Sequence, residues 1–183
     1  PVNKDGGVTT AWPNQSFGGS GRADLAAVAY GGYLYSIGGY NAHTSTYYNT
    51  VQYAAIDDDC SLGTWTNTNA FDTGGNARGG ITAFAYNGYM YVAGGINASG
   101  NFNTVRYAPI NSNGSVGTWN STTNLPAAMN RHRTVVWGGR VYLLGGTQLA
   151  LPDPNNGATT GSRPTGSGSA NTYHPTINRD GTL

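Results

Sequence analysis

The sequence predicts an all-β protein, and three observations support this fold class: the residue types, the many turn glycines and an internal repeat. The chain of 183 residues contains 29 glycines and 13 tyrosines, and only 9% of its residues are charged. It has a single lysine and no glutamate, although these residues dominate helix surfaces. Tyrosine, threonine and glycine favour short strands joined by tight turns.

The internal repeat is visible when the sequence is compared with itself. Three segments align without gaps and each ends in Gly-Gly: residues 30–39, 86–95 and 137–146. Between them, Trp65 and Trp119 are 54 residues apart, and each ends a Gly-Thr-Trp sequence. A fixed period of this length is the signature of a repeat architecture.

Each repeat is predicted to contain four strands. The first strands are expected at residues 23–30, 81–86 and 133–137, and each is followed by a two-residue turn: Gly31-Gly32, Asn87-Gly88 and Gly138-Gly139. Such pairs suit a type I′ hairpin. The second strand ends at the Gly-Gly pair, the third covers residues 50–56, 104–110 and 172–177, and the fourth carries the tryptophan. Four strands in about 50 residues predict one blade of a β-propeller.

The repeats define the expected organisation of the chain. Residues 1–13 match the outer-strand end of a preceding blade, and the three blades cover residues 21–66, 77–120 and 130–183. The third blade contains a long loop at residues 147–170 and an incomplete outer strand. We therefore expect three consecutive four-stranded antiparallel blades of a larger propeller, or of one completed by identical chains.

The repeat resembles that of the kelch family. The resemblance rests on the three Gly-Gly pairs, on Tyr53 and Tyr107, and on Trp65 and Trp119, in copies that cover essentially the whole chain. Arg22 and Arg78 match the arginine that often opens the first kelch strand, whereas Met129 holds that place in the third repeat. Twelve residues separate Tyr53 from Trp65, which is more than in most kelch blades. In this respect the chain is similar to bacterial kelch-like surface proteins.

The resemblance implies a fold more than a function, because kelch propellers include both enzymes and non-catalytic adaptors. A galactose-oxidase-like copper site is disfavoured, since His43, His132 and His174 occur at unrelated positions of the repeat and Cys60 is the only cysteine. The Asp- and Asn-rich turns at residues 3–6, 57–60, 111–114 and 178–181 resemble parts of a calcium loop. We interpret them as β-turns, because no glutamate is present to complete a calcium site.

The candidate binding surface consists of the loops between the second and third strands, which are rich in Tyr, Asn, Ser and Gly. Arginines that open the first strands would form a cationic ring for carboxylates or acidic sugars if they faced the propeller axis. The favoured alternative is that they donate hydrogen bonds to backbone carbonyls of the neighbouring blade. The candidate ligand-binding residues are Tyr40, His43, Tyr47, Tyr48, Asn97, Asn101, Phe102, Arg22, Arg78 and Arg131.

The predicted function is a non-catalytic recognition or structural module, extracellular or at a cell surface, with a protein or carbohydrate ligand. The alternative is part of a carbohydrate-active or galactose-oxidase-like enzyme whose catalytic residues lie outside this segment. A net charge of +1 gives no basic surface for nucleic acid, and no apolar run is long enough for a membrane span. No cofactor, metal or catalytic residue is predicted from the sequence. Further blades of the same chain, or identical chains, are the remaining expected partners.

Overall fold

The computed structural model describes residues 21–147 and 172–183, and these residues form only strands, turns and loops. The all-β prediction is therefore confirmed for this part of the chain. The expectations for residues 1–13 and for most of the loop at residues 147–170 lie outside the described residues. The described part contains no helix that could serve as a membrane span.

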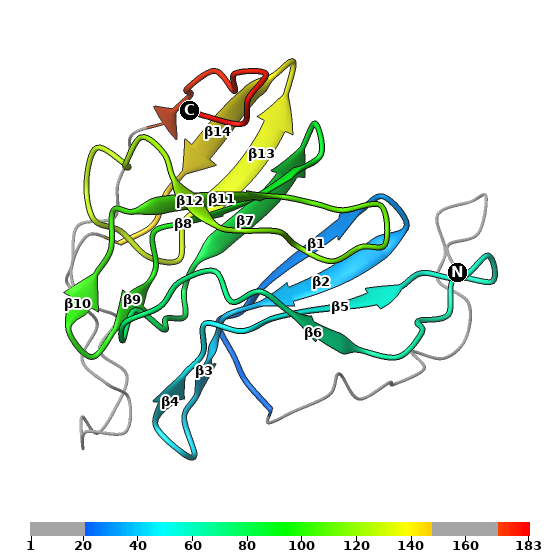
Figure 1. Cartoon of the computed structure of the whole chain (residues 1–183). Helices are drawn as coiled ribbons and strands as arrows, with labels where there is room; N and C mark the ends of the chain where they lie inside the picture. Colours follow the sequence, from blue (N-terminus) through cyan, green and yellow to red (C-terminus); the bar gives the residue numbers. More distant parts are fainter. Residues whose placement is uncertain (1–20, 148–171) are drawn as a thin grey trace, which may run out of the picture.

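Three antiparallel sheets follow one another along the chain (Figure 1). The first sheet has the strand order β1 (Ala26–Tyr30), β2 (Tyr33–Ile37), β5 (Val51–Ala55), β6 (Thr66–Thr68). The second has β7 (Thr82–Tyr86), β8 (Tyr89–Ala93), β11 (Val105–Pro109), β12 (Asn120–Ser121). The third has β13 (Arg133–Trp137), β14 (Arg140–Leu144), β15 (Thr172–Tyr173).

The first two strands of every sheet are joined by the predicted turns. Both residues of each turn have positive φ, between 49° and 81°, which the mirror-image type I′ turn requires and which Gly and Asn tolerate best. The Gly-Gly pairs also lie where predicted, directly after β2, β8 and β14. Strand β15 is shorter than predicted, because Pro175 has no N–H to continue the ladder. Pairing resumes only as a single bridge between Arg140 and Thr176.

The sheets lie side by side, with β7 in contact with both β1 and β13 (Figure 1). One apolar cluster lies between the first and second sheets, and a second cluster lies between the second and third. Tyr35 and Tyr91 are fully buried at equivalent places in the two clusters. Their hydroxyls donate to the carbonyls of Gly114 and Gly181 in the next sheet, at 2.8 and 2.9 Å. The same contact between a tyrosine hydroxyl and a glycine carbonyl therefore joins the first sheet to the second and the second to the third.

The third sheet has an apolar face that no described residues cover. Val135, Trp137 and Leu144 are 57%, 78% and 46% exposed. Trp137 is the last residue of β13, as Tyr30 is the last residue of β1. In the first sheet, the hydroxyl of Tyr30 accepts a hydrogen bond from the N–H of Gly88 in the second sheet, at 2.7 Å. The face that joins one sheet to the next is thus present again on the third sheet.

Candidate functional site

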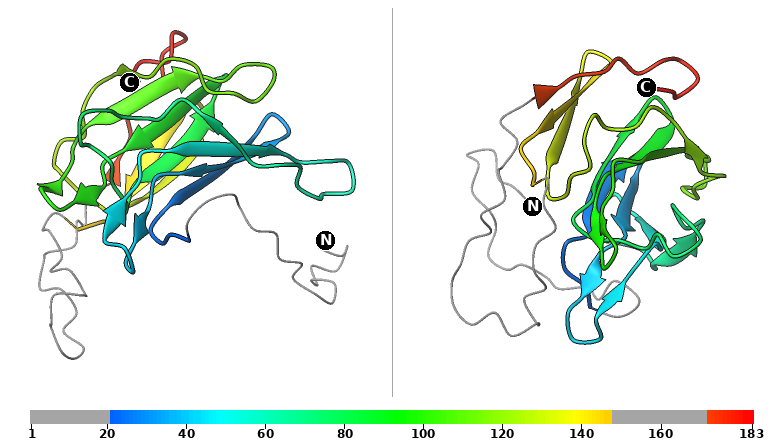
Figure 2. Two further views of the ribbon diagram at one scale, coloured as in Figure 1. Left: turned by 60° about the horizontal axis from the view of Figure 1, so that its bottom comes forward. Right: turned by 90° about the vertical axis from the view of Figure 1, so that its left-hand side faces the viewer.

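Two of the predicted binding loops form small hairpins at the same end of the sheets. Strands β3 (Tyr40–Asn41) and β4 (Thr46–Tyr47) make the first hairpin, and β9 (Ile96–Asn97) and β10 (Gly100–Asn101) make the second. Each hairpin begins directly after a Gly-Gly pair and closes with a bond of 2.9 Å to the second glycine's carbonyl. Both views of Figure 2 show the β3–β4 hairpin, in cyan, projecting beyond the sheets. The hairpins are consequently anchored on rigid strands.

The first hairpin carries an aromatic pair and an exposed tip. The rings of Tyr40 and Tyr47 lie 4.4 Å apart between centroids, at an interplanar angle of 34°, and both residues are half-buried. His43 is exposed at the tip. The side chain of Asn41 accepts a bond from the N–H of Thr44 at 3.0 Å and donates to the carbonyl of Gly21 at 2.7 Å. The turn is therefore fixed by its own polar contacts.

In the second hairpin, the two predicted asparagines bond to the fold itself. The amide of Asn97 donates to the carbonyls of Gly75 and Ala77, at 3.3 and 3.1 Å. Asn101 accepts a bond from the side chain of Asn130 at 2.8 Å. These contacts tie the hairpin to neighbouring segments, so that both asparagines have structural partners.

Two predicted arginines stack on the aromatic residues that follow the hairpins. The guanidinium of Arg22 lies 4.1 Å from the ring centroid of Tyr48, and that of Arg78 lies 4.4 Å from that of Phe102. Arg22 also donates to the carbonyl of Gly38 at 3.2 Å and to the hydroxyl of Thr50 at 2.7 Å, both within its own repeat. These four side chains therefore stabilise the junction between each sheet and its hairpin.

Arg78 is the most deeply buried charge of the described residues. Its side chain is fully buried and forms an ion pair of 3.3 Å with the nearly buried Asp72. Burial lowers the pKa of Arg78 to about 10, Asp72 opposes this shift, and Arg106 adds to it. Asp72 also accepts from Arg106 at 3.3 Å. No sequence pattern identifies Asp72 as part of a site, because the equivalent residue of the next repeat is Pro126.

Arg131 does not belong to the same structural position as Arg22 and Arg78. The N–H groups of Ala23, Gly79 and Asn130 make equivalent bonds to the segments after the Gly-Gly pairs. Met129, which precedes Asn130, is therefore the counterpart of Arg22 and Arg78, as the repeat alignment indicates. The hypothetical ring of three equivalent arginines is absent from the described part of the chain.

Arg131 occupies instead an inner position shared with Asp24 and Gly80. All three residues have positive φ, of 54° to 60°, and a backbone chain joins them: Gly80 donates to the carbonyl of Asp24 at 2.8 Å, and Arg131 donates to that of Gly80 at 2.6 Å. Because Gly80 has no side chain, Arg131 reaches over it to Asp24 and forms an ion pair of 2.6 Å. The sequence does contain a signal for this ion pair, because Asp24 and Arg131 have opposite charges at the same position of the first and third repeats.

A polar hollow of about 350 Å³ lies along these inner segments, lined by β1, β7 and β13 residues. The hydroxyls of Thr82 and Thr134 are 2.7 Å apart in it. Arg133 is exposed and donates to the carbonyls of Arg131 and His132, at 3.3 and 3.2 Å. The hollow therefore offers hydroxyl and guanidinium groups, with Asp24 already paired.

The Asp- and Asn-rich turns at residues 57–60, 111–114 and 178–181 are β-turns with side chains bonded back to the backbone, as interpreted from the sequence, and the turn at residues 3–6 lies outside the described residues. Asp59, Asn113 and Asp180 each accept a bond from the N–H two residues later, at 2.9 to 3.1 Å. The side-chain and backbone hydrogen bonds of Ser61 lower the pKa of Asp59, and the backbone and side-chain hydrogen bonds of Thr182 lower the pKa of Asp180. Cys60 is exposed in the first of these turns. Among residues 21–147 and 172–183, no group of three or more His, Cys, Asp or Glu side chains could hold a metal ion.

No protein-family model matches the chain, and no curated protein matches it.

Proposed function

We propose that this chain comprises three successive blades of a kelch-like β-propeller and acts as a non-catalytic recognition module. Its ligand is a carbohydrate, bound at the β3–β4 hairpin, and its place is outside the cell or on the cell surface. The observation that carries the binding proposal is the aromatic pair of Tyr40 and Tyr47 on a hairpin anchored to a rigid sheet.

The propeller proposal is supported by the repeated way in which the sheets meet. The inner strands β1, β7 and β13 are neighbours, and the bonds of Tyr35 and Tyr91 to the following sheet recur at the same position. Each joining face is covered by the next sheet, except on the third, where Trp137 is 78% exposed. A further blade, from the same or an identical chain, fits this pattern, since propellers close with about four to eight blades.

The carbohydrate proposal is supported by the composition of the first hairpin. Tyrosine rings combine an apolar face with a polar hydroxyl, which suits the alternating C–H and hydroxyl groups of a sugar ring. His43 at the tip and the hydroxyls of Thr44 and Ser45 are exposed beside the pair and can supply hydrogen bonds. Pockets that recognise small ligands use the same combination of aromatic surface and few polar groups. A protein ligand is the alternative occupant of the same hairpin.

A glycan array with a hairpin-swapped variant tests this proposal. The hydrogen bonds of the two hairpins place Ile96 and Asn101 at the positions of Tyr40 and Tyr47. The double variant Tyr40→Ile/Tyr47→Asn therefore introduces side chains that this chain already accommodates at those positions. We expect the wild type to bind a defined set of glycans and the variant to lose at least tenfold in affinity with unchanged thermal stability.

The matched control is the reverse exchange in the second hairpin, Ile96→Tyr/Asn101→Tyr, which should leave the glycans bound by the wild type unchanged. Equal glycan binding by the wild type and the Tyr40→Ile/Tyr47→Asn variant would contradict the site. Failure of the wild type to bind any glycan, together with capture of a protein partner through the same hairpin, would favour the alternative.

A further inference from the structure

A cleft of about 540 Å³ lies at the outer side of the junction between the first and second sheets. Residues 69–73, which follow β6, line one wall, and Arg106 of β11 lines the other together with Thr118 and Trp119, which precede β12. Strands β6 and β12 are the outermost strands of their sheets. The cleft is therefore remote from the inner strands β1, β7 and β13, and both of its walls belong to neighbouring sheets that the structure describes.

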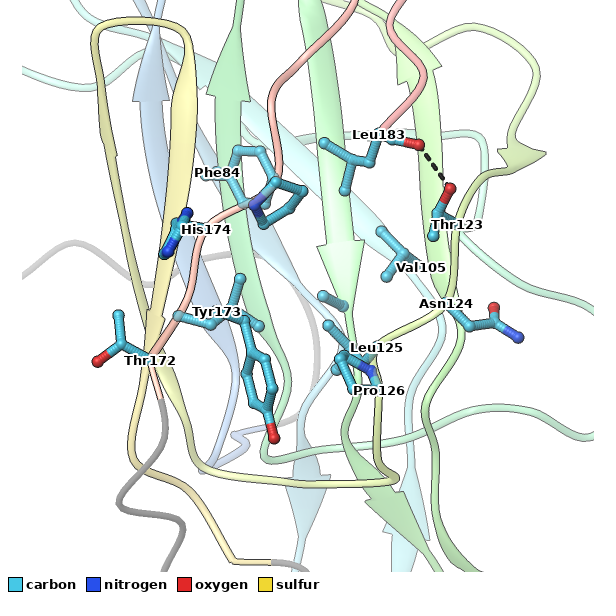
Figure 3. Close-up of a pocket in the computed structure, with 13 residues that line it drawn as sticks. Phe84, Val105, Thr123, Asn124, Leu125, Pro126, Thr172, Tyr173, His174 and Leu183 are labelled. Carbon is cyan, nitrogen blue, oxygen red and sulfur yellow. Dashed lines mark hydrogen bonds between the residues drawn. The ribbon is translucent and has the colours of Figure 1, made fainter.

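The equivalent space between the second and third sheets is an apolar groove of about 380 Å³ (Figure 3). Pro126 and Tyr173 line this groove at the positions of the repeat that Asp72 and Arg106 occupy beside the cleft. In the first sheet, Gln52 occupies the position of Arg106, because both pair with the same residue of the second strand of their sheets. The repeat thus forms these positions without charged residues, and the charges beside the cleft are not required by the fold.

Two guanidinium groups share one carboxylate beside the cleft. The Oδ2 atom of Asp72 lies 3.3 Å from Nη1 of Arg78 and 3.3 Å from Nε of Arg106. Its Oδ1 atom accepts hydrogen bonds from Nη2 of Arg106 at 3.4 Å and from the N–H of Thr73 at 3.0 Å. Of the described residues that line the cleft, only Asp72 and Arg106 are ionisable. Two positive charges and one negative charge therefore leave a positive charge in excess, which suits an anionic ligand.

Arg106 is the member of this cluster that a ligand can reach. Its side chain is 24% exposed, whereas the side chains of Arg78 and Asp72 are 0% and 6% exposed. A guanidinium has five N–H groups, and Arg106 donates one from Nε and one from Nη2 to Asp72, and one from Nη1 to the hydroxyl of Ser121. One N–H group on each Nη atom therefore has no partner among the described residues and is available to an anion in the cleft.

Trp119 supplies the aromatic wall of the cleft. The indole is half-buried and lines the cleft. Its Nε1–H donates to the carbonyl of Asn69 at 2.9 Å. The indole also makes an edge-to-face contact with the ring of Phe71, with centroids 6.4 Å apart and an interplanar angle of 73°. These two contacts hold the indole in place, so that it can act as a fixed apolar surface.

We propose that this cleft binds an acidic sugar residue, a uronate. The carboxylate of the sugar accepts hydrogen bonds from the two remaining N–H groups of Arg106 and neutralises the excess positive charge. The C–H face of the sugar ring packs on Trp119, and the exposed hydroxyls of Thr73 and Thr118 bond to the ring hydroxyls. An aromatic surface with a few polar groups is typical of sites for small ligands. The site does not depend on the β3–β4 hairpin and takes a charged ligand.

The test is an NMR titration of the 183-residue protein with the methyl glycosides of glucuronate and galacturonate. The neutral methyl glucoside and methyl galactoside are the matched control ligands. We expect the acidic sugars to cause saturable shift changes of the indole Nε1–H of Trp119 and of the Nε–H of Arg106, whereas the indole of Trp65 should not respond. The neutral sugars should bind about tenfold more weakly or less, because they lose hydrogen bonds to a charged group. Added salt should weaken the binding of the acidic sugars.

The variant Arg106→Gln separates the guanidinium from the rest of the cleft. Glutamine is already accommodated at this position in the first sheet, as Gln52. We expect the variant to lose about tenfold or more in affinity for the acidic sugars. The matched control is Arg179→Gln, which removes the same charge from an exposed turn and should leave binding unchanged. The amide of methyl glucuronoside tests the same contact on the wild-type protein and should bind as weakly as the neutral sugars.

Four outcomes would overturn the proposal. The first is the absence of shift changes at Trp119 with the acidic sugars, and the second is equal binding of the glucuronate and its amide. The third is an unchanged affinity of the Arg106→Gln variant. The fourth is binding of acetate as tight as that of the acidic sugars, which would show an anion site without sugar recognition. The Tyr40→Ile/Tyr47→Asn variant should bind the acidic sugars as the wild type does, so that failure here is distinguishable from failure of the carbohydrate proposal.

Discussion

The interface between the first and second sheets and the interface between the second and third share a backbone design but differ in their side chains. In both, the second glycine of a Gly-Gly pair donates to a carbonyl in the segment that leads to the next sheet, Gly39 to Arg78 at 3.1 Å and Gly95 to Met129 at 2.8 Å. The first interface is filled by Phe71, Ile81 and Trp119. The second has Leu125 and His132 at the places of Phe71 and Ile81, and a groove at the place of Trp119. The backbone bonds thus set how the sheets meet, and the side chains decide how well the interface is filled.

Truncating the equivalent residues Phe71 and Leu125 should show this difference most strongly. Phe71 is fully buried and Leu125 is 7% exposed beside the open groove. We expect Phe71→Ala to lower the free energy of unfolding by about 3–5 kcal/mol, because it removes a fully buried aromatic ring. Leu125→Ala should cost only about 2 kcal/mol, since it removes a smaller side chain. Urea denaturation measures both, and a larger loss for Leu125→Ala would contradict the comparison.

Acid should destabilise the second interface more than the first. His132 is fully buried, and neither ring nitrogen has a hydrogen-bond partner among the described residues. Burial, with a smaller effect of Arg133, lowers the pKa of His132 to about 4 from its usual 6.5. The unfolded chain therefore binds this proton at a higher pH than the folded chain. The free energy of unfolding therefore keeps its full value above pH 6.5. It decreases as the pH falls towards 4, by about 3 kcal/mol at most.

The variant His132→Leu separates this effect from the titration of carboxylates, because it removes only the imidazole. Leucine is a suitable replacement, since Leu25 occupies the equivalent position of the first sheet. Unfolding free energies of the wild type and the variant, measured from pH 7 to pH 4, should diverge, with the wild type losing more. Parallel pH profiles would show that His132 does not control the acid response.

The sequence predicted those parts of the fold that depend on local backbone geometry. The type I′ turns at Gly31, Asn87 and Gly138 and the strand ends at the Gly-Gly pairs are confirmed, because positive φ is a local requirement that Gly and Asn meet. Side-chain burial is less local: Trp65 and Trp119, at equivalent positions of the repeat, are only half-buried. An indole at a sheet edge keeps one side towards solvent.

The candidate site could be predicted only at the level of its loops. The Tyr40–Tyr47 contact follows from a short hairpin, whose residues are close in sequence. The pairing of Arg131 with Asp24 spans 107 residues, and the burial of Arg78 against Asp72 depends on how two sheets pack. Such contacts require the register of neighbouring repeats to be known in three dimensions.

One chain extension tests directly the proposal that the sheets are successive blades, each covered by the next. Leu183 is equivalent to Leu62, so a copy of residues 63–116 appended after Leu183 supplies a Gly-Thr-Trp segment and a copy of strands β7, β8 and β11. The measurement is acrylamide quenching of Trp137, obtained by difference from a Trp137→Phe version of the same extended chain. We predict that quenching falls several-fold and that the emission shifts to shorter wavelength, because the new sheet covers Val135, Trp137 and Leu144. Unchanged quenching of Trp137 in a folded extension would contradict the account.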